Sequence, residues 1–498
     1  EDPARRLTVP ESPVAVQPLF DAWAANYPAD ELTFVGMEFP TAVEPYYSGR
    51  MNWRPDEGDA QFLERRWNAS TGEVLPERGD GLSTWLRDFH RDLMWPAALG
   101  GRTVGRGLVG VAGIVMLLSV VTGILTHRKI LKEFFTLRVR RSVRLKWKDG
   151  HNVLGIWTLP FSIMIAFTGA WLGIIVLLLP VTGMLIFKGD TDSVVEAVAG
   201  AQTERAGISA PMLSFDEVAK RPHMDTGLLP AGVFAQHWGD QNAEYTVNYP
   251  PKTELYYYDV QRVSGVTGAA LPMTGLLEPG AATRAIAALT PLHYGLYGGV
   301  ALKFLYLALG LGLSAMVALG NMVWIERRAH SAEGQRSPQF YDRLSRLTVG
   351  VCMGLPVASV AIFYTDLAYA GIEDDRIFWI GCTYLGSWAA ALGYAFGAAN
   401  GYRATRNLMY LTGAGLLGVP LAGALAAGEA PWAVLARGHS AAPAVDLTLL
   451  LLGLLCLLVA RRLPTQRAVE VRRQRRRRAP AAEPPAMAEE PARTGTYS

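Results

Sequence analysis

The stretch Gly107-Leu-Val-Gly-Val-Ala-Gly-Ile-Val-Met-Leu-Leu-Ser-Val-Val-Thr-Gly-Ile-Leu-Thr126 decides the fold class, because its twenty residues carry no charge. A helix of this length rises about 30 Å, the thickness of a bilayer's hydrocarbon core. Half of the 498 residues are hydrophobic and only 18% are charged. We therefore predict an α-helical integral membrane protein with seven visible spans. The six further runs, the last interrupted only by Asp446, are 152–187, 304–325, 347–365, 377–402, 407–428 and 441–460.

The second run is too long for one straight span. Its 36 residues would form a helix of about 54 Å. We expect Pro160 and Pro180 to kink or end it, because proline lacks the backbone N–H that continues a helix.

Positive charge in the loops predicts the orientation. Segment 128–149 holds nine Lys or Arg against two acids, and further arginines follow the third, fifth and seventh runs. The positive-inside rule makes these segments cytoplasmic and places segments 1–85 and 188–285 outside. An outside start and an inside C-terminus predict a cleaved signal peptide or one further span before Glu1.

The two outer segments have the alternating patterns of small α+β modules. Strand patterns occur at 32–37, on both sides of the turn Asn68-Ala-Ser-Thr-Gly72, at 244–249 and at 254–260. We predict two small extracytoplasmic α+β modules. The predicted units are 1–85 and 188–285 as modules, 86–187 as a transmembrane pair with the basic loop 128–149, 286–328 as a transmembrane helix, 345–462 as four helices, and 463–498 as a basic and then disordered tail.

Four histidines lie at the ends of these spans. His90 and His293 are expected at the outer face, and His127 and His151 at the cytoplasmic face. An imidazole in a bilayer needs a partner, and two facing imidazoles are suitable axial ligands for haem iron. The alternative is that each histidine is only hydrogen-bonded or solvated.

Two haems follow if the histidines are ligands. The 25 residues from Arg102 to His127 span about 38 Å as a helix, so the two faces cannot share one iron. Arg106, Arg128 and Lys129 are candidate partners for the propionates. The acids at Asp366 and 373–375 border an outer loop, where we expect a solvated surface rather than a metal site.

Several motifs give the chain a family resemblance. It resembles the PepSY-associated transmembrane family, iron-regulated bacterial inner-membrane proteins that include ferric-siderophore reductases. The similarity covers roughly residues 1–330. Its motifs are Phe89-His-Arg-Asp-Leu93, Gly123-Ile-Leu-Thr-His-Arg-Lys-Ile130 with Phe134-Phe135, Asp149-Gly-His-Asn-Val-Leu-Gly155 with Leu159-Pro-Phe161, Leu292-His-Tyr-Gly-Leu-Tyr-Gly-Gly299, and Met322-Val-Trp-Ile-Glu-Arg-Arg328.

The resemblance implies a haem-containing reductase of the inner membrane. Two bis-histidine haems b would carry electrons outward to a periplasmic ferric siderophore or similar ferric complex, releasing Fe(II). Family members usually begin with a span that carries its own histidine, which could pair with either His151 or His127. The inner pairing stays open, whereas His90 with His293 is the expected outer pair.

The expected partners are the ferric complex, membrane lipid and an electron donor. The cytoplasmic loops are too short for a flavin or nicotinamide domain, so a quinol or a cytoplasmic reductase is expected to supply electrons. No nucleic-acid partner is expected. Two other hypotheses remain: a siderophore or metal transporter without redox chemistry, and a PepSY-type sensor or assembly protein.

Overall fold

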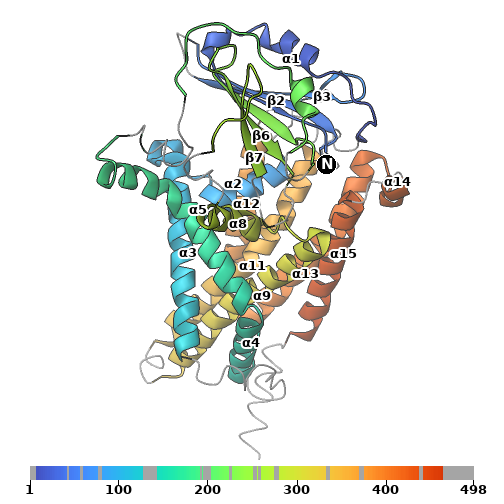
Figure 1. Ribbon diagram of the computed structural model, residues 1–498. Helices are drawn as coiled ribbons and strands as arrows, with labels where there is room; N and C mark the ends of the chain where they lie inside the picture. Colours follow the sequence, from blue (N-terminus) through green and yellow to red (C-terminus); the bar gives the residue numbers. More distant parts are fainter. Residues whose placement is uncertain are drawn as a thin grey trace, which may run out of the picture.

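The computed structural model shows a bundle of long helices with a β-sheet domain at one end, which we call the sheet end; the opposite end is the distal end (Figure 1). The described residues are 7–41, 44–55, 60–76, 81–126, 143–190, 193, 203–223, 227–250, 255, 259–273, 280–331, 337–369, 375–436 and 441–463.

Six of the described helices are long and apolar enough to cross a membrane. Their apolar side chains turn outward as well as inward, which is typical of helices solvated by lipid rather than water. These candidate spans are α3 (Gly101–Thr126), the Leu159–Leu178 part of α5 (Leu159–Leu185), α9 (Gly299–Ala329), α11 (Pro338–Ala368), α13 (Gly401–Ala427) and, from Ala442, α15 (Ala441–Arg462).

The seventh predicted span is also a helix, α12 (Arg376–Gly397). It lies along α11, and its Ile380, Tyr384, Ala391 and Ala395 are buried. It is not among the six candidate spans.

The predicted break in the long second run is observed near Pro160. Helix α4 (Val143–Trp157) and α5 are separated by Thr158 alone. Helix α5 begins at Leu159 and has Pro160 in its first turn. Proline is tolerated there because the first N–H groups of a helix have no intrahelical partner. Pro180 does not end the helix, since α5 continues to Leu185.

The prediction of two outer modules is wrong, because the two segments form one domain. Strands from both segments form one seven-stranded sheet in the order β4-β3-β2-β1-β5-β6-β7. The join is the antiparallel pair β1–β5, in which Val35 lies opposite Ala235 and Glu38 opposite Gly232. The strands are β1 (Leu32–Glu38), β2 (Tyr46–Trp53), β3 (Gln61–Asn68), β4 (Val74–Leu75), β5 (Gly232–Gln236), β6 (Glu244–Tyr249) and β7 (Asp259–Ser264).

The predicted turn between β3 and β4 is confirmed. The Asn68 side chain accepts a hydrogen bond from the Ser70 N–H at 2.8 Å, and the Gly72 N–H donates to the Asn68 carbonyl. Gly72 has a φ of +76°, a conformation that glycine adopts without strain.

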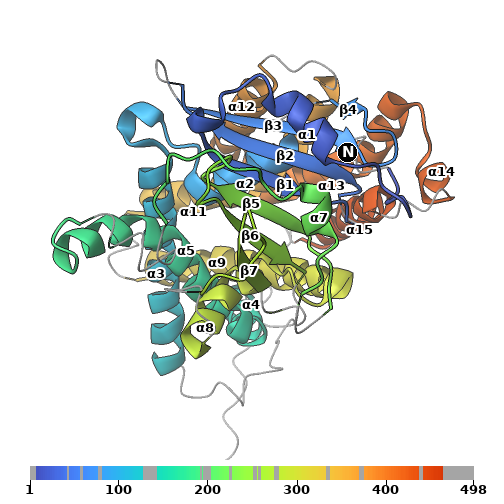
Figure 2. The same ribbon diagram turned by 45° about the horizontal axis from the view of Figure 1, so that its top comes forward.

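The two faces of the sheet differ in chemistry. One face packs on α1 (Gln17–Ala24) and α7 (Phe215–Ala219), which bury Phe20 and Phe215 in one apolar core. Both helices lie on the side away from the bundle (Figures 1 and 2). The alternate residues, including Glu38, Ser48 and Arg50, therefore lie on the face turned toward the membrane helices.

Two short helices lie between the sheet and the long helices. Helix α2 (Leu82–Asp92) is followed by Leu93, and α8 (Ala281–Tyr294) is followed by Gly295. Both of these capping residues have the left-handed backbone conformation that ends a helix. The predicted transmembrane helix at 286–328 is therefore two elements, because Gly295 and Gly298 separate α8 from α9. The remaining short helices are η2 (Ala29–Glu31), η3 (Ala97–Leu99) and α14 (Pro431–Ala436).

Candidate functional site

The predicted outer histidine pair comes together at the sheet end. His90, in the last turn of α2, faces His293, in the last turn of α8, with ring centres 6.2 Å apart and ring planes 27° apart. A metal–imidazole bond is about 2 Å long, so two imidazoles on opposite sides of one metal ion have ring centres roughly 6 Å apart. The observed separation therefore suits two axial ligands of one iron.

A hydrogen bond fixes the protonation of His293. The Thr168 hydroxyl lies 2.8 Å from the Met164 carbonyl, which can only accept, so the hydroxyl donates there. Thr168 Oγ1 is also 3.0 Å from His293 Nδ1 and must accept its N–H. Nε2 is then left with a free lone pair, as in most metal-binding histidines.

The surroundings of His293 keep its ring neutral. Burial, and to a smaller extent the neighbouring His90, lowers the pKa of His293 to about 4. A neutral ring can bind metal at pH 7, whereas a protonated one cannot.

Contacts from two spans hold α8 in place. The Tyr306 hydroxyl of α9 donates to the Leu292 carbonyl at 2.7 Å. On α5, a Cβ added at Gly169 would lie 3.0 Å from Cε1 of His293, so only a residue without a side chain allows this close approach. The outer site is therefore assembled from α2, α5, α8 and α9.

Arg106 is a candidate partner for a carboxylate near this site. Its Nε is buried and has no hydrogen-bond partner among the described residues. Its carbonyl lies against Gly173, one helical turn from Gly169 on α5. An unsatisfied guanidinium N–H in an apolar region suits a haem propionate, and this role of Arg106 stays a prediction.

The second predicted site lies nearer the distal end of the bundle. His151 of α4 lines a cavity of about 510 Å³ between α3, α5 and α9. Its volume is within the range of roughly 300–1,000 Å³ that organic ligands and cofactors occupy. The lining is mainly apolar, and its polar residues besides His151 are Ser119, Asn152, Ser162 and Asn321.

His151 is oriented by the same kind of hydrogen bond as His293. Its Nδ1 lies 2.9 Å from the Met316 carbonyl of α9, so Nδ1 donates and Nε2 keeps its lone pair. Gly320 supports the ring from the same helix, since an added Cβ would lie 3.0 Å from His151 Cε1. The two sites thus share one arrangement, a donated Nδ1–H and a glycine against the ring.

His127, Arg128 and Lys129 lie outside the described residues, which stop at Thr126 of α3 and resume at Val143. The end of α3 that precedes His127 contributes Gly123 and Ile124 to the cavity of His151. The pairing of His151 with His127 stays a prediction.

The cavity of His151 extends toward the outer site along α5. Ser162 lines this cavity, and Thr168 on the same helix is hydrogen-bonded to His293. Six residues of helix correspond to about 9 Å, which separates the edge of the cavity from the outer site.

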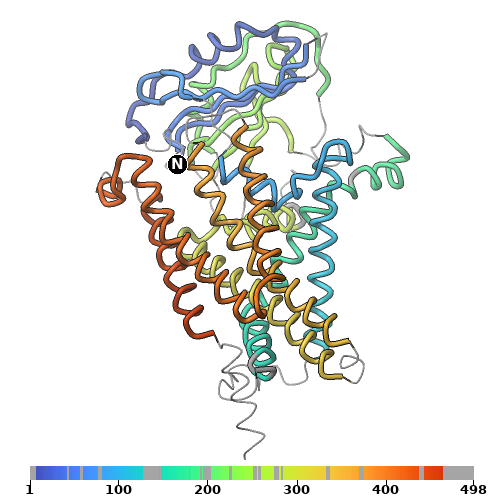
Figure 3. The backbone as a smooth tube through the Cα atoms, turned by 180° about the vertical axis from the view of Figure 1, so that it is seen from behind, coloured from blue at the N-terminus to red at the C-terminus, as the bar shows by residue number. Residues whose placement is uncertain are grey.

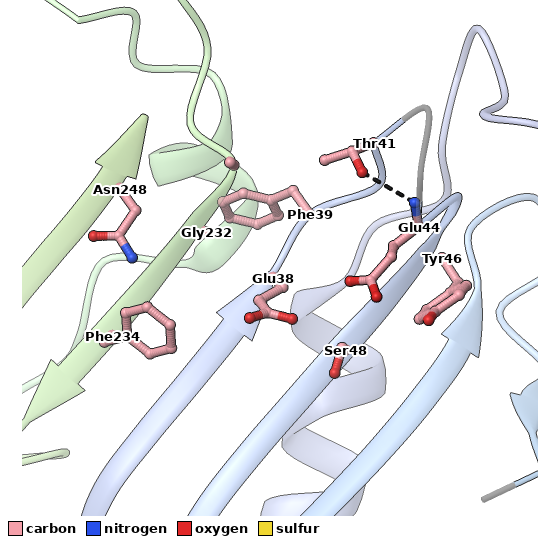
Figure 4. A pocket seen from close by; sticks show the side chains of 10 residues that line it. Glu38, Phe39, Thr41, Glu44, Tyr46, Ser48, Gly232, Phe234 and Asn248 are labelled. Carbon is pink, nitrogen blue, oxygen red and sulfur yellow. Dashed lines mark hydrogen bonds between the residues drawn. The ribbon is translucent and has the colours of Figure 1, made fainter. Parts of the chain in front are cut away.

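A smaller pocket of about 210 Å³ lies on the polar face of the sheet, where β1 meets β5 (Figure 4). Glu38, Glu44 and Ser48 line one side, and Phe234 and Asn248 line the other. Burial raises the pKa of Glu38 although Arg50 is only 2.7 Å away. This face offers charged and hydrogen-bonding groups to a polar ligand.

Sequence reasoning missed the residues that orient the histidines. The Thr168 hydroxyl lies inside an apolar run, and this position could have indicated a hydrogen-bonding role. The Met316 carbonyl is part of the backbone, so no sequence pattern indicates its role. Asp366, expected to be solvated, instead accepts hydrogen bonds from Arg376 and from the Leu82 N–H of α2. Among the described residues, no three His, Cys, Asp or Glu side chains form a metal-ion site.

The apolar helices and the extramembrane sheet define a membrane protein with a folded domain at one end of its bundle. The chain belongs to the family described as the PepSY-associated TM region, whose model matches residues 2–327. It is similar to the uncharacterized protein PA4219 of Pseudomonas aeruginosa, with 30% identity over 366 residues that cover 70% of this chain and 89% of that relative. Helices α11 to α15 follow the region that the family model matches.

Proposed function

We propose that this protein is a haem-containing reductase that carries electrons from the distal end of the bundle to a ferric complex, such as a ferric siderophore, at the sheet end. The observation that carries the proposal is the His90–His293 pair, with ring centres 6.2 Å apart and a fixed Nδ1–H donor on His293. Two imidazoles at this spacing suit a bis-histidine haem b.

The protein's own residues would bind and orient the cofactors. His90 and His293 would hold the outer haem, with Arg106 placed for a propionate. His151 would hold the inner haem from one side, with His127 as a candidate partner. Bound haem b supplies a one-electron iron couple whose potential depends on axial ligands, burial and hydrogen bonds.

The polar face of the sheet supports the location of the substrate. It is turned toward the bundle, and its charged groups include Glu38, Glu44 and Arg50. Reduction of a bound ferric complex by one electron gives Fe(II), which oxygen-donor chelators hold more weakly than Fe(III), so the iron is released. A quinol or a cytoplasmic reductase would supply the electron.

Charge at the distal end supports an inner-membrane location with the sheet in the periplasm. Arginines lie near the C-terminal ends of α9 and α15 and near the N-terminal ends of α11 and α13. These four helix ends lie opposite the sheet (Figure 3). The positive-inside rule places that end in the cytoplasm. These residues are Arg327, Arg328, Arg343, Arg346, Arg403, Arg461 and Arg462.

A reduced-minus-oxidised absorption spectrum of the detergent-purified protein, with a haem-to-protein ratio, tests the proposal. Two low-spin haems per chain, reoxidised on addition of ferrioxamine or another ferric chelate, are expected. A folded protein that takes up no haem when supplied with it would overturn the proposal.

A further inference from the structure

Helix α2, which carries His90, packs against two helices outside the family-matched region. Leu82 and Trp85 of α2 form one buried apolar cluster with Ala358 and Ile362 of α11 and Ile380 of α12. The His90 ring itself is exposed. The position of this imidazole therefore depends on what holds its helix.

A carboxylate from α11 caps the start of α2. Gly81 at the N-cap has no side chain to accept the first N–H groups, and Asp366 Oδ1 accepts the Leu82 N–H at 3.2 Å instead. Arg376, the first residue of α12, donates to the same oxygen at 2.8 Å. A negative charge at a helix N-terminus is favourable, and the arginine fixes where that charge lies.

An aromatic contact holds the middle of α2. Trp85 and Phe89 stack at 5.1 Å with planes 6° apart, and the Tyr384 ring of α12 lies 4.9 Å from Trp85 and 5.0 Å from Phe89. Such ring pairs add to the stabilisation from burial and restrict geometry. Phe89 directly precedes His90, so this contact acts close to the imidazole.

Contacts with α3 hold the C-terminal end of α2, where buried Gly105 packs against the Asp92 carbonyl. Arg102 of α3 reaches Asp88 at 3.2 Å and Asp92 at 3.5 Å, but its side chain is 67% exposed. Ion pairs at such positions contribute little to stability. Contacts with α11 and α12 thus hold the start and middle of α2, and contacts with α3 hold its C-terminal end.

We infer that α11 and α12 position His90 for iron binding, with Asp366 and Tyr384 as positioning residues. The binding of iron by His90 rests on the proposed function, whereas the positioning of α2 rests on its contacts with α11 and α12. It gives the C-terminal helices a role in the outer site, which they do not touch directly.

The test combines a measurement of α2 that needs no haem with one that does. Spin labels at the exposed positions Arg87→Cys and Leu296→Cys, with Cys352, Cys382 and Cys456 replaced by alanine, report the distance between α2 and the end of α8. We expect Asp366→Ala and Tyr384→Ala to shift or broaden this distance. In the haem-loaded protein, the two variants should speed transfer of the outer haem to apomyoglobin roughly tenfold, because the helix that carries His90 is then held less firmly.

Matched variants separate positioning from general damage. Asp342→Ala removes the same type of residue from the other end of α11, where it pairs with Arg346 at 2.7 Å, and should leave both measurements unchanged. Tyr384→Phe keeps the ring and should behave like the unmodified protein. An unchanged inner-haem spectrum shows that the variants are folded.

The two ideas fail differently. If Asp366→Ala and Tyr384→Ala leave the label distance and haem transfer as they were, or if Asp342→Ala changes them equally, the positioning role is wrong. If the protein binds no haem but the label distance still changes only in the first two variants, the positioning of α2 stands and the reductase proposal falls.

Discussion

The outer and inner histidine sites orient their imidazoles alike but are assembled from different sets of elements. The outer site is a pair of imidazoles on two short helices, α2 and α8, each positioned by contacts with longer helices. The inner site is a cavity of about 510 Å³ between long helices, with His151 on its wall. The comparison indicates that the outer site depends on where helices are held, whereas the inner site depends on the volume between them.

Removing a histidine is expected to have the largest effect on this comparison. His293→Ala or His90→Ala should reduce two haems per chain to one, and His151→Ala should remove the other, because an axial bond is lost. Pyridine haemochromogen analysis gives the ratio. His330→Ala, an exposed histidine at the end of α9, is the control and should keep both haems. Loss of both haems from any single outer variant would contradict two separate sites.

Filling the space against each ring should have the next largest effect. Gly169→Val would push on His293 and Gly320→Val on His151, since an added Cβ already lies 3.0 Å from each ring. We expect the first to weaken only the outer haem and the second only the inner haem, each at a cost of about 1–3 kcal/mol from overpacking. Gly310→Val serves as the control, because no atom lies within 4 Å of its added Cβ.

The hydrogen bond to His293 should have a smaller effect. Thr168→Val removes the acceptor of the Nδ1–H and should weaken outer haem binding about tenfold, whereas Thr168→Ser should retain it. Haem titration of the two variants measures the difference. Equal affinities would mean that the hydroxyl does not orient the ring. The inner counterpart is the Met316 carbonyl, which no side-chain substitution removes.

The pH dependence of the haem-free protein should show the smallest effect. The pKa of His293 falls from its ordinary 6.5 to about 4 in the folded chain. The unfolded chain therefore binds the proton first as pH falls, so stability from the neutral ring is present above pH 6.5 and lost toward pH 4. Allowing for solvent screening, the loss is on the order of 2 kcal/mol.

Thermal unfolding at pH 7, 5.5 and 4.5 measures this loss. The His293→Phe variant lacks the titrating ring, so its melting temperature should fall less over the same range. Because the carboxylates titrate alike in both proteins, the difference isolates His293. Parallel curves for the two proteins would show that the ring is not kept neutral by its surroundings.

Local sequence patterns predicted the elements but not their partners. Apolar runs predicted the long helices, Pro160 predicted the break before α5, and alternation predicted β1 and β6. The pairing of β1 with β5 joins residues about 200 positions apart, and alternation within a strand carries no information about such a neighbour.

The candidate site was predictable to a similar extent. His90 and His293 were expected to pair, and the structure brings them together. The backbone carbonyl of Met316 and the cap from Asp366 depend on tertiary placement. Asp366 looked like a solvated loop acid because its partner, Leu82, is far away in the sequence.

The single sheet also constrains how the chain enters the membrane. Strands β1 to β4 precede α3 and α5, and β5 to β7 follow them, so the sheet closes only if the chain crosses the membrane and returns to the side it left. A failed crossing would leave β1 with an unpaired edge, which invites aggregation. Closure of β1 against β5 would thus act as a check on insertion, made by the folded domain itself after the helices have crossed.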